Sequence, residues 1–158
     1  MKFAFYEAPF GPLLLAAENE QLVEIRFSGQ PADDWEPDDR ALRFASEQLA
    51  AWFAGRTQTF DLPLAPRGTD FQRSVWNLLL TVPYAETTSY GSLAQQLGKP
   101  AASRAVGAAN GANPIPIVIP CHRVIGANRS LTGFGGGLPV KRWLLDHEAR
   151  TAGRVLPF

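Results

Sequence analysis

Short runs of apolar residues alternate with polar residues over the first 30 positions of the chain. The runs are FAFYE at 3–7, LLLAAE at 13–18 and LVEIRF at 22–27, and they are separated by Pro9, by Gly11 with Pro12, and by Asn19. Alternation with a period of two, bounded by turn-forming residues, is typical of antiparallel strands. The pattern predicts a small antiparallel meander at the start of the chain.

The spacing of the apolar positions becomes helical further along the chain. A helix is predicted from Asp38 or Asp39 to Gly55, and one of its faces is apolar: Leu42, Ala45, Leu49, Trp52 and Phe53. Residues 57–64 favour one more strand, and APRG at 65–68 is the best candidate for a linker. We therefore expect two domains, residues 1–65 and residues 66–158.

Two helices are predicted after the linker. Thr69 or Asp70 can cap a helix that continues to Leu80, because an oxygen in its side chain can accept a hydrogen bond from a free backbone N–H. Ser89 can cap a second, shorter helix that ends at Gln96.

Two more helices complete the predicted second half. Gly98, Lys99 and Pro100 form a turn before a helix over residues 101–112, which ends because Asn113 precedes a proline. A last helix begins at Pro139. The expected fold class is α+β, with a small N-terminal α/β domain followed by a mostly helical C-terminal domain.

The net charge of zero hides an asymmetry between the two halves. Residues 1–65 carry five Lys and Arg against eleven Asp and Glu, whereas residues 66–158 carry ten Lys and Arg against four Asp and Glu. The basic half is therefore the part that can meet a polyanion. The hydrophobic content of 46% is ample for a packed core.

The location expected for the protein follows from its apolar runs and its cysteine content. No apolar run approaches the roughly 20 residues that cross a bilayer, and the N-terminus has no signal-peptide pattern. The single cysteine cannot form an internal disulfide, which fits a reducing compartment. We expect a cytoplasmic protein, or a nuclear one if the source has a nucleus, and no membrane partner.

The helices on either side of residues 98–100 favour a helix-turn-helix, although a plain helical corner has the same spacing. The second helix reads AASRAVGAANGA, so Arg104 is its only long polar side chain and Asn110 its only amide. Such a helix has little with which to read base edges, but it can approach DNA closely, and Arg104 suits the space that a displaced base leaves. Alternatively, its small residues pack against neighbouring helices and Arg104 is a surface charge.

The chain's only cysteine, Cys121, lies in PIPIVIPCHRVIG at 114–126. A lone cysteine is most often buried and inert. Here, however, the apolar run ends at Cys121, three prolines stiffen the backbone, and His122 and Arg123 provide a cationic setting that favours a thiolate. These features make Cys121 a candidate nucleophile.

A catalytic role for His122 needs more than adjacency to Cys121. Neighbouring side chains of an extended segment point to opposite faces, so His122 needs a turn or a bridging water to reach the sulfur, and a carboxylate to orient its ring. The carboxylates available in the basic half are Asp70, Glu86, Asp146 and Glu148. A metal site at Cys121, His122, His147 and Glu148 is disfavoured, because it has one sulfur and no ligand pair spaced on one loop.

Three ordered motifs resemble the O6-alkylguanine-DNA alkyltransferases, also called methylated-DNA–protein-cysteine methyltransferases. They are SYGSLAQQLGKPAASRAVGAA at 89–109, NPIP with PCHRVIG at 113–126, and LTGFGGGLPVKRWLLDHE at 131–148. The resemblance covers residues 69–150, and the N-terminal part is compatible with that family's ribonuclease-H-like α/β domain. It implies repair of double-stranded DNA by irreversible, stoichiometric transfer of a methyl or other alkyl group from guanine O6, and it leaves O4 of thymine open as a second site.

The resemblance also implies roles for individual residues. Cys121 is the alkyl acceptor of an enzyme that works once, His122 is the base acting through a water, and Glu148 orients His122. Asn113 holds the turn before the cysteine segment.

The same resemblance implies how damaged DNA is held. Arg104 takes the place of a flipped guanine, which must leave the stack before a thiol can reach its alkyl carbon. Tyr90 crowds the phosphate and donates a hydrogen bond to the base. Further contacts to the base or the DNA are expected from Val124, Gly135, Ser103 and Arg123. We expect a monomer without a cofactor.

The sequence departs from the family pattern at two points. Some relatives bind zinc through N-terminal cysteines and histidines, and residues 1–65 contain neither, so we expect no metal. Gly135 stands where some members carry a hydroxyl residue, so a backbone donor is retained but a side-chain contact is lost.

A non-catalytic, alkyltransferase-like lesion binder is the main alternative function, and the intact PCHR argues against it. A thiol hydrolase additionally needs turnover and a path for water.

Overall fold

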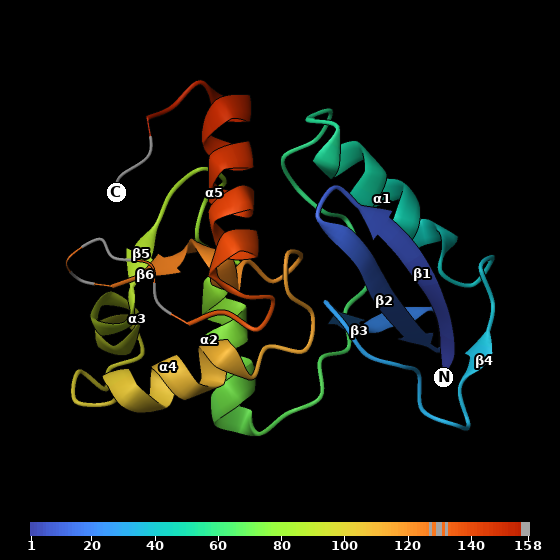
Figure 1. Ribbon diagram of the computed structural model, residues 1–158. Helices are drawn as coiled ribbons and strands as arrows, with labels where there is room; N and C mark the ends of the chain where they lie inside the picture. Colours follow the sequence, from blue (N-terminus) through green and yellow to red (C-terminus); the bar gives the residue numbers. More distant parts are fainter. Residues whose placement is uncertain (127, 129–130, 132, 156–158) are drawn as a thin grey trace. The chain divides into compact units, whose positions relative to one another are not determined.

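The computed structural model describes residues 1–126, 128, 131 and 133–155. Its contacts divide the chain into two units, Met1–Arg67 and Gly68–Phe158, so the boundary lies two residues beyond the expected end of the first domain at residue 65 (Figure 1). Arg129, one of the ten basic residues of the second half, and Thr132 of the third motif lie outside the described residues.

Unit 1 is built on a four-stranded sheet with the order β3-β2-β1-β4 (Figure 1). β1 (Lys2–Ala8), β2 (Gly11–Glu18) and β3 (Gln21–Arg26) pair antiparallel, which confirms the predicted meander. β4 (Glu36–Pro37), which the sequence did not predict, adds parallel to β1. β2 is an inner strand whose residues 13–17 are all buried, so both of its faces belong to the core.

The helix of unit 1, α1 (Arg43–Phe53), begins later than predicted. Residues 39–42 form turns instead, and the Ala41 N–H donates to Asp38 Oδ1 at 3.0 Å ahead of the helix. The buried face of α1 is the predicted one, with Ala45, Leu49 and Trp52. Tyr6 of β1 stacks on Phe53 with ring centroids 5.9 Å apart, so α1 packs on the sheet.

The prediction of a strand over residues 57–64 is wrong. Only Leu64 forms a bridge, parallel to Leu22 of β3, and the Leu22 N–H donates to the Pro63 carbonyl at 2.9 Å. Pro63 has no N–H with which to extend a ladder. Phe60 nevertheless stacks on Trp52, so this segment covers the core without joining the sheet.

Unit 2 begins with α2 (Asp70–Leu79), whose start matches the prediction. The Thr69 hydroxyl accepts from the Gln72 N–H at 3.1 Å while the Gln72 side chain accepts from the Thr69 N–H, which forms a capping box. Trp76 of α2 is buried, and its Nε1–H donates to the Ala109 carbonyl at 2.8 Å. This bond joins α2 to α4.

The next two helices of unit 2 are α3 (Tyr90–Gln96) and α4 (Ser103–Gly111), separated by a short turn (Figure 1). Ser89 caps α3 as predicted, because its hydroxyl accepts from the Ser92 N–H. Gly98, which has a φ of 72°, provides the left-handed residue that this turn requires. The last helix, α5 (Leu138–Ala152), has a proline in its first turn, as predicted.

The segment that carries Cys121 is not extended, although the sequence argument about His122 treated it as extended. Residues 114–120 form turns with one isolated bridge, and Cys121–Arg123 is a single turn of 3-10 helix, η1. The prolines remove backbone donors that a strand needs, and Ile117 bends the chain with a φ of 76°. After η1, β6 (Val124–Ile125) pairs in parallel with β5 (Thr88–Ser89).

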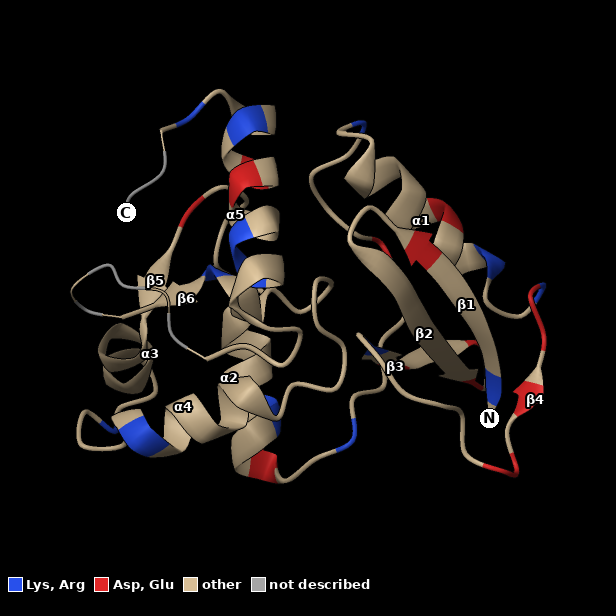
Figure 2. Cartoon of the chain, in the orientation of Figure 1, with Lys and Arg blue, Asp and Glu red and all other residues tan. Residues whose placement is uncertain are grey.

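The combination of mixed sheet and helices confirms the expected α+β fold class. Acidic residues of unit 1 lie at β4 and in the loops beside it (Figure 2). None of the described helices combines the length and the apolar character that crossing a bilayer requires.

Candidate active site

A buried carboxylate, Glu148 of α5, organises the residues that follow Cys121. His122 Nε2 lies 2.5 Å from Glu148 Oε2, and Arg123 Nε donates to Glu148 Oε1 at 2.9 Å. The Ala85 N–H donates to the same Oε1 at 2.9 Å, and Arg123 Nη1 donates to the Val82 carbonyl at 2.8 Å. His122 and Glu148 have no exposed surface. One carboxylate therefore fixes η1 and the loop after α2 together.

The charge state of this cluster follows from its hydrogen bonds. Burial by itself raises the pKa of Glu148, but His122 and Arg123 outweigh burial and lower that pKa to about 2. Glu148 is therefore an anion. Because its folded pKa is below the ordinary value of 4.5, the stability that it provides is complete above pH 4.5 and is lost as the pH falls toward 2.

The protonation state of His122 follows from burial and from Glu148. Burial lowers the pKa of His122 below 6.5, although the Glu148 carboxylate opposes this shift, so the ring is neutral at neutral pH. A neutral ring carries one N–H, and a carboxylate can only accept, so Nε2 carries the hydrogen. Nδ1 is then the acceptor of the ring. His122 is thus prepared to take up a proton on Nδ1.

The Cys121 thiol is buried, with 5% of the residue exposed. Burial raises the pKa of this thiol to about 11, although the Asn113 side chain and the Lys141 charge act in the opposite direction. The expectation that His122 and Arg123 favour a thiolate is therefore wrong. His122 is neutral and the charge of Arg123 is bound to Glu148, so neither outweighs the loss of solvent around the sulfur.

Asn113 closes the turn that precedes Cys121. Its Nδ2 donates to the Ile119 carbonyl at 2.8 Å, while its Oδ1 accepts from the Ile115 N–H at 3.0 Å. The same side chain forms a hydrogen bond with the Cys121 thiol, which lowers the thiol pKa. Asn113 therefore links the end of α4 to the cysteine through the residues between them.

Lys141 is a site residue that the sequence reasoning missed. It is fully buried, and its Nζ donates to the Val124 carbonyl at 2.6 Å. Burial lowers the pKa of Lys141 to about 8, which nearby Cys121 opposes. Lys141 precedes Glu148 by seven residues, or two helical turns, so both lie on the same face of α5. That spacing is the signal that would have identified it.

Arg123 does not lie where a DNA contact is expected. The residue is 7% exposed, and its guanidinium is bound to Glu148 and Val82. It also lies 5.5 Å from the centroid of the Tyr84 ring. Because these protein groups occupy its donors, Arg123 belongs to the buried network instead.

The small sheet of β5 and β6 brings Tyr90 next to the cysteine segment. Ser89 pairs with Ile125, and Tyr90 follows Ser89 as the first residue of α3. Tyr90 is half-buried, and its ring lies against the α4 backbone, since a β-carbon built at Gly107 would be 3.7 Å from Tyr90 Cδ1. Val124, which pairs with Thr88 in the same sheet, is fully buried.

The other expected contact residues lie outside the buried network. Ser103 and Arg104 form the first turn of α4, where Ser103 is half-buried and Arg104 is exposed. Gly135 is exposed in the loop before α5, and a β-carbon built there would meet nothing within 4 Å. A hydroxyl side chain at this position would therefore fit.

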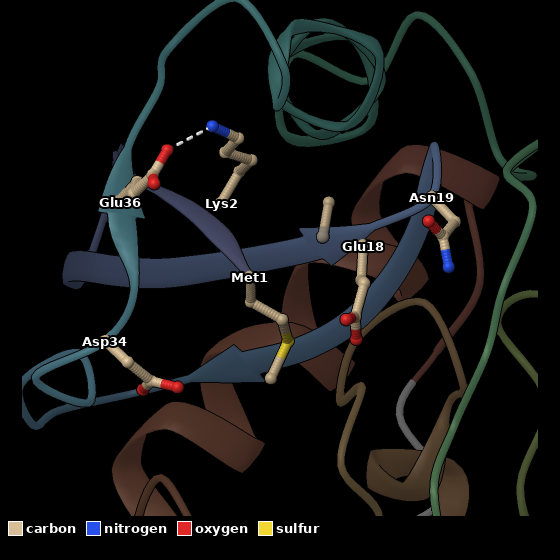
Figure 3. A pocket seen from close by; sticks show the side chains of 7 residues that line it. Met1, Lys2, Glu18, Asn19, Asp34 and Glu36 are labelled. Carbon is tan, nitrogen blue, oxygen red and sulfur yellow. Dashed lines mark hydrogen bonds and ion pairs between the residues drawn. The ribbon is translucent and has the colours of Figure 1, made fainter.

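No second centre of comparable chemistry stands out in unit 1. A pocket of about 250 Å³ is lined by Met1, Lys2, Ala17, Glu18, Asn19, Asp34 and Glu36 (Figure 3). Glu36 pairs with Lys2, and Glu18 pairs with Arg67, so two of its carboxylates are already neutralised. Within residues 1–126, 128, 131 and 133–155, no group of three or more His, Cys, Asp and Glu side chains could hold a metal ion.

Both units match the domains of a known class of DNA methyltransferase. The family described as "6-O-methylguanine DNA methyltransferase, DNA binding domain" matches residues 70–150, and its "ribonuclease-like domain" matches residues 1–66. The chain belongs to the 6-O-methylguanine DNA methyltransferase family.

Two named relatives and one solved structure are similar to this chain over nearly its whole length. A methylated-DNA–protein-cysteine methyltransferase of Methanosarcina acetivorans is 50% identical over 153 residues, which cover 94% of this chain and 98% of the relative. The Mycobacterium tuberculosis protein of the same name is 51% identical over 150 residues, covering 92% of this chain and 91% of the relative. The crystal structure of Mycobacterium tuberculosis OGT in complex with DNA has a TM-score of 0.91 and 49% identity, covering 96% of this chain and 94% of that one.

The Glu148 network predicts a strongly non-additive effect on stability. Glu148→Gln leaves Arg123 buried without its anion, so the free energy of unfolding should fall by about 3–5 kcal/mol. Arg123→Met in the same background removes the uncompensated charge and should restore part of this loss. Urea unfolding of the two single variants and the double variant measures the coupling. Losses that add within about 0.5 kcal/mol would show that the two side chains are energetically independent.

Proposed function

We propose that this protein repairs DNA by moving a methyl or other alkyl group from O6 of guanine onto Cys121, irreversibly and once per molecule. The observation that carries the proposal is a buried cysteine thiol followed directly by a neutral histidine, whose Nε2 is held by the ionised Glu148. The names of its relatives support the same chemistry. No cofactor is required, because the displaced guanine is itself the leaving group.

The transfer begins with removal of the thiol proton, because a thiol with a pKa of about 11 is a weak nucleophile at neutral pH. We assign this step to His122 Nδ1, acting through a water, with Glu148 stabilising the ring as it becomes positively charged. The sulfur then attacks the alkyl carbon, the S–C bond forms, and the C–O6 bond breaks with its electron pair moving to the guanine. The proton lost by the thiol is balanced by one gained by the guanine.

The active site requires the damaged base to leave the stack, since the alkyl carbon of a paired guanine is beyond the reach of a buried thiol. In our proposal α3 and α4 act as a helix-turn-helix whose second helix enters the minor groove. The exposed Arg104 fills the gap that the flipped guanine leaves, and Tyr90 contacts the phosphate and the base. Val124 and Gly135 contribute backbone contacts to the base, and Ser103 contributes to DNA binding.

The partner that we propose is double-stranded DNA containing O6-alkylguanine, bound by a monomer. Phosphate contacts give such binding a marked salt dependence and little sequence preference. A reducing compartment such as the cytoplasm keeps Cys121 as a thiol, and this is the location that we propose.

Intact-protein mass spectrometry tests the reaction. Incubation with duplex DNA that carries O6-methylguanine should add the mass of one methyl in place of hydrogen, about 14 Da, to every active molecule. The gain should stop at one equivalent and be absent in Cys121→Ser. Tight binding of the lesion without a gain in mass would instead indicate a non-catalytic lesion binder, and release of product with turnover would indicate a hydrolase.

The role of Arg104 predicts a difference between two substrates. Arg104→Ala should slow repair of duplex DNA about tenfold or more, because flipping costs a few kcal/mol that the arginine offsets, while the reaction with free O6-benzylguanine base stays unchanged. Arg154→Ala removes another exposed positive charge of unit 2 and serves as the control. Equal losses on both substrates would contradict the proposed role.

A further inference from the structure

A side chain outside the assigned catalytic set, Asn110 of α4, lies beside the alkyl acceptor. Only 4% of Asn110 is exposed, and its Nδ2 donates to the Cys121 carbonyl at 3.5 Å. This distance is at the long end for a hydrogen bond. Asn110 therefore contacts the backbone of the residue whose sulfur receives the alkyl group.

The orientation of the Asn110 amide follows from its partner. The Cys121 carbonyl can only accept, so the amide nitrogen must face it and the amide oxygen must point elsewhere. This oxygen, Oδ1, is buried, and the described residues supply no hydrogen-bond donor to it. A buried acceptor without a donor is unfavourable, and such atoms are rare in folded proteins. A donor from outside the chain is therefore expected in the working complex.

The chemistry of the damaged base restricts what that donor can be. Alkylation at O6 removes the proton from N1 of guanine, so the exocyclic amine on C2 is the only N–H donor left on the base. For reaction, the alkyl carbon must come within about 3.5 Å of the Cys121 sulfur. The O6-alkyl group and the C2 amine lie on the same edge of the base. When the alkyl group is brought to Cys121, the C2 amine therefore comes close to the groups around the Cys121 carbonyl.

We propose that Asn110 Oδ1 accepts a hydrogen bond from the exocyclic amine of O6-alkylguanine, which makes Asn110 a residue that determines base specificity. The inference rests on the proposed alkyl transfer to Cys121. It adds a side-chain contact to the backbone contacts expected from Val124 and Gly135. A base without this amine, such as O6-methylhypoxanthine or O4-methylthymine, leaves Oδ1 buried and without a donor, so the site disfavours it.

The test compares two duplexes that differ only in this amine, one with O6-methylguanine and one with O6-methylhypoxanthine. The wild-type protein should transfer the methyl group from guanine about tenfold faster or more, measured as the second-order rate of mass gain. Asn110→Leu, which is similar in size but has no acceptor, should lower this preference about tenfold. The loss should come from the guanine rate, with little change on hypoxanthine.

Three outcomes are distinguishable. A wild-type preference close to one overturns the inference without any variant, so the test remains decisive if Asn110→Leu does not fold. Equal slowing on both duplexes in Asn110→Leu also overturns it, because a structural role or a bound water on Oδ1 would affect both bases alike. Absence of transfer from either base contradicts the proposed function itself.

Discussion

The buried carboxylate of Glu148 is the constraint on which the rest of the site depends. A charge without exposed surface is costly unless hydrogen bonds compensate it, and here His122, Arg123 and the Ala85 N–H provide them. These groups come from η1 and from the loop after α2, while Glu148 comes from α5. The anion therefore sets the position of the cysteine segment, the hydrogen position on His122 and the burial of Arg123 at once.

This arrangement gives the cysteine a different character from that of a conventional reactive thiol. The thiol is buried, and burial raises its pKa to about 11, where an activated thiolate would have a low pKa. Such a thiol is protected from unwanted reaction in the resting protein. In our proposal it becomes a nucleophile when His122 takes its proton, and the ring is neutral and able to do so because burial lowers its pKa. A protein that is consumed by one reaction benefits from this restraint.

The sequence predicted correctly those helix starts that depend on hydrogen bonds between residues close together in the chain. Thr69 and Ser89 begin α2 and α3 because a hydroxyl satisfies a free N–H, and this depends on neighbours in sequence. The strand expected at 57–64 did not form. Pro63 has no N–H, so pairing of this segment with β3 is limited to the single bridge between Leu64 and Leu22.

The prediction of the site was limited by burial, which the sequence does not reveal. The family motifs pointed to Cys121, His122 and Glu148, and the structure brings the last two into contact. Arg123 was expected to contact the base or the DNA and Lys141 was not singled out, yet both are buried and bound to groups 25 and 17 residues away in the sequence. The pKa of Cys121 was misjudged for the same reason, because loss of solvent outweighs the charges that follow it.

The state of the His122 ring tests the central claim most directly. The chain has only two histidines, so the ring nitrogens of His122 can be identified in a ¹⁵N NMR spectrum by comparison with His122→Gln. The account predicts a neutral ring with its hydrogen on Nε2 that persists at pH 6.5, where half of an ordinary histidine is protonated. A charged ring at that pH, or a neutral ring with its hydrogen on Nδ1, would contradict the claim that Glu148 prepares His122 to accept the thiol proton.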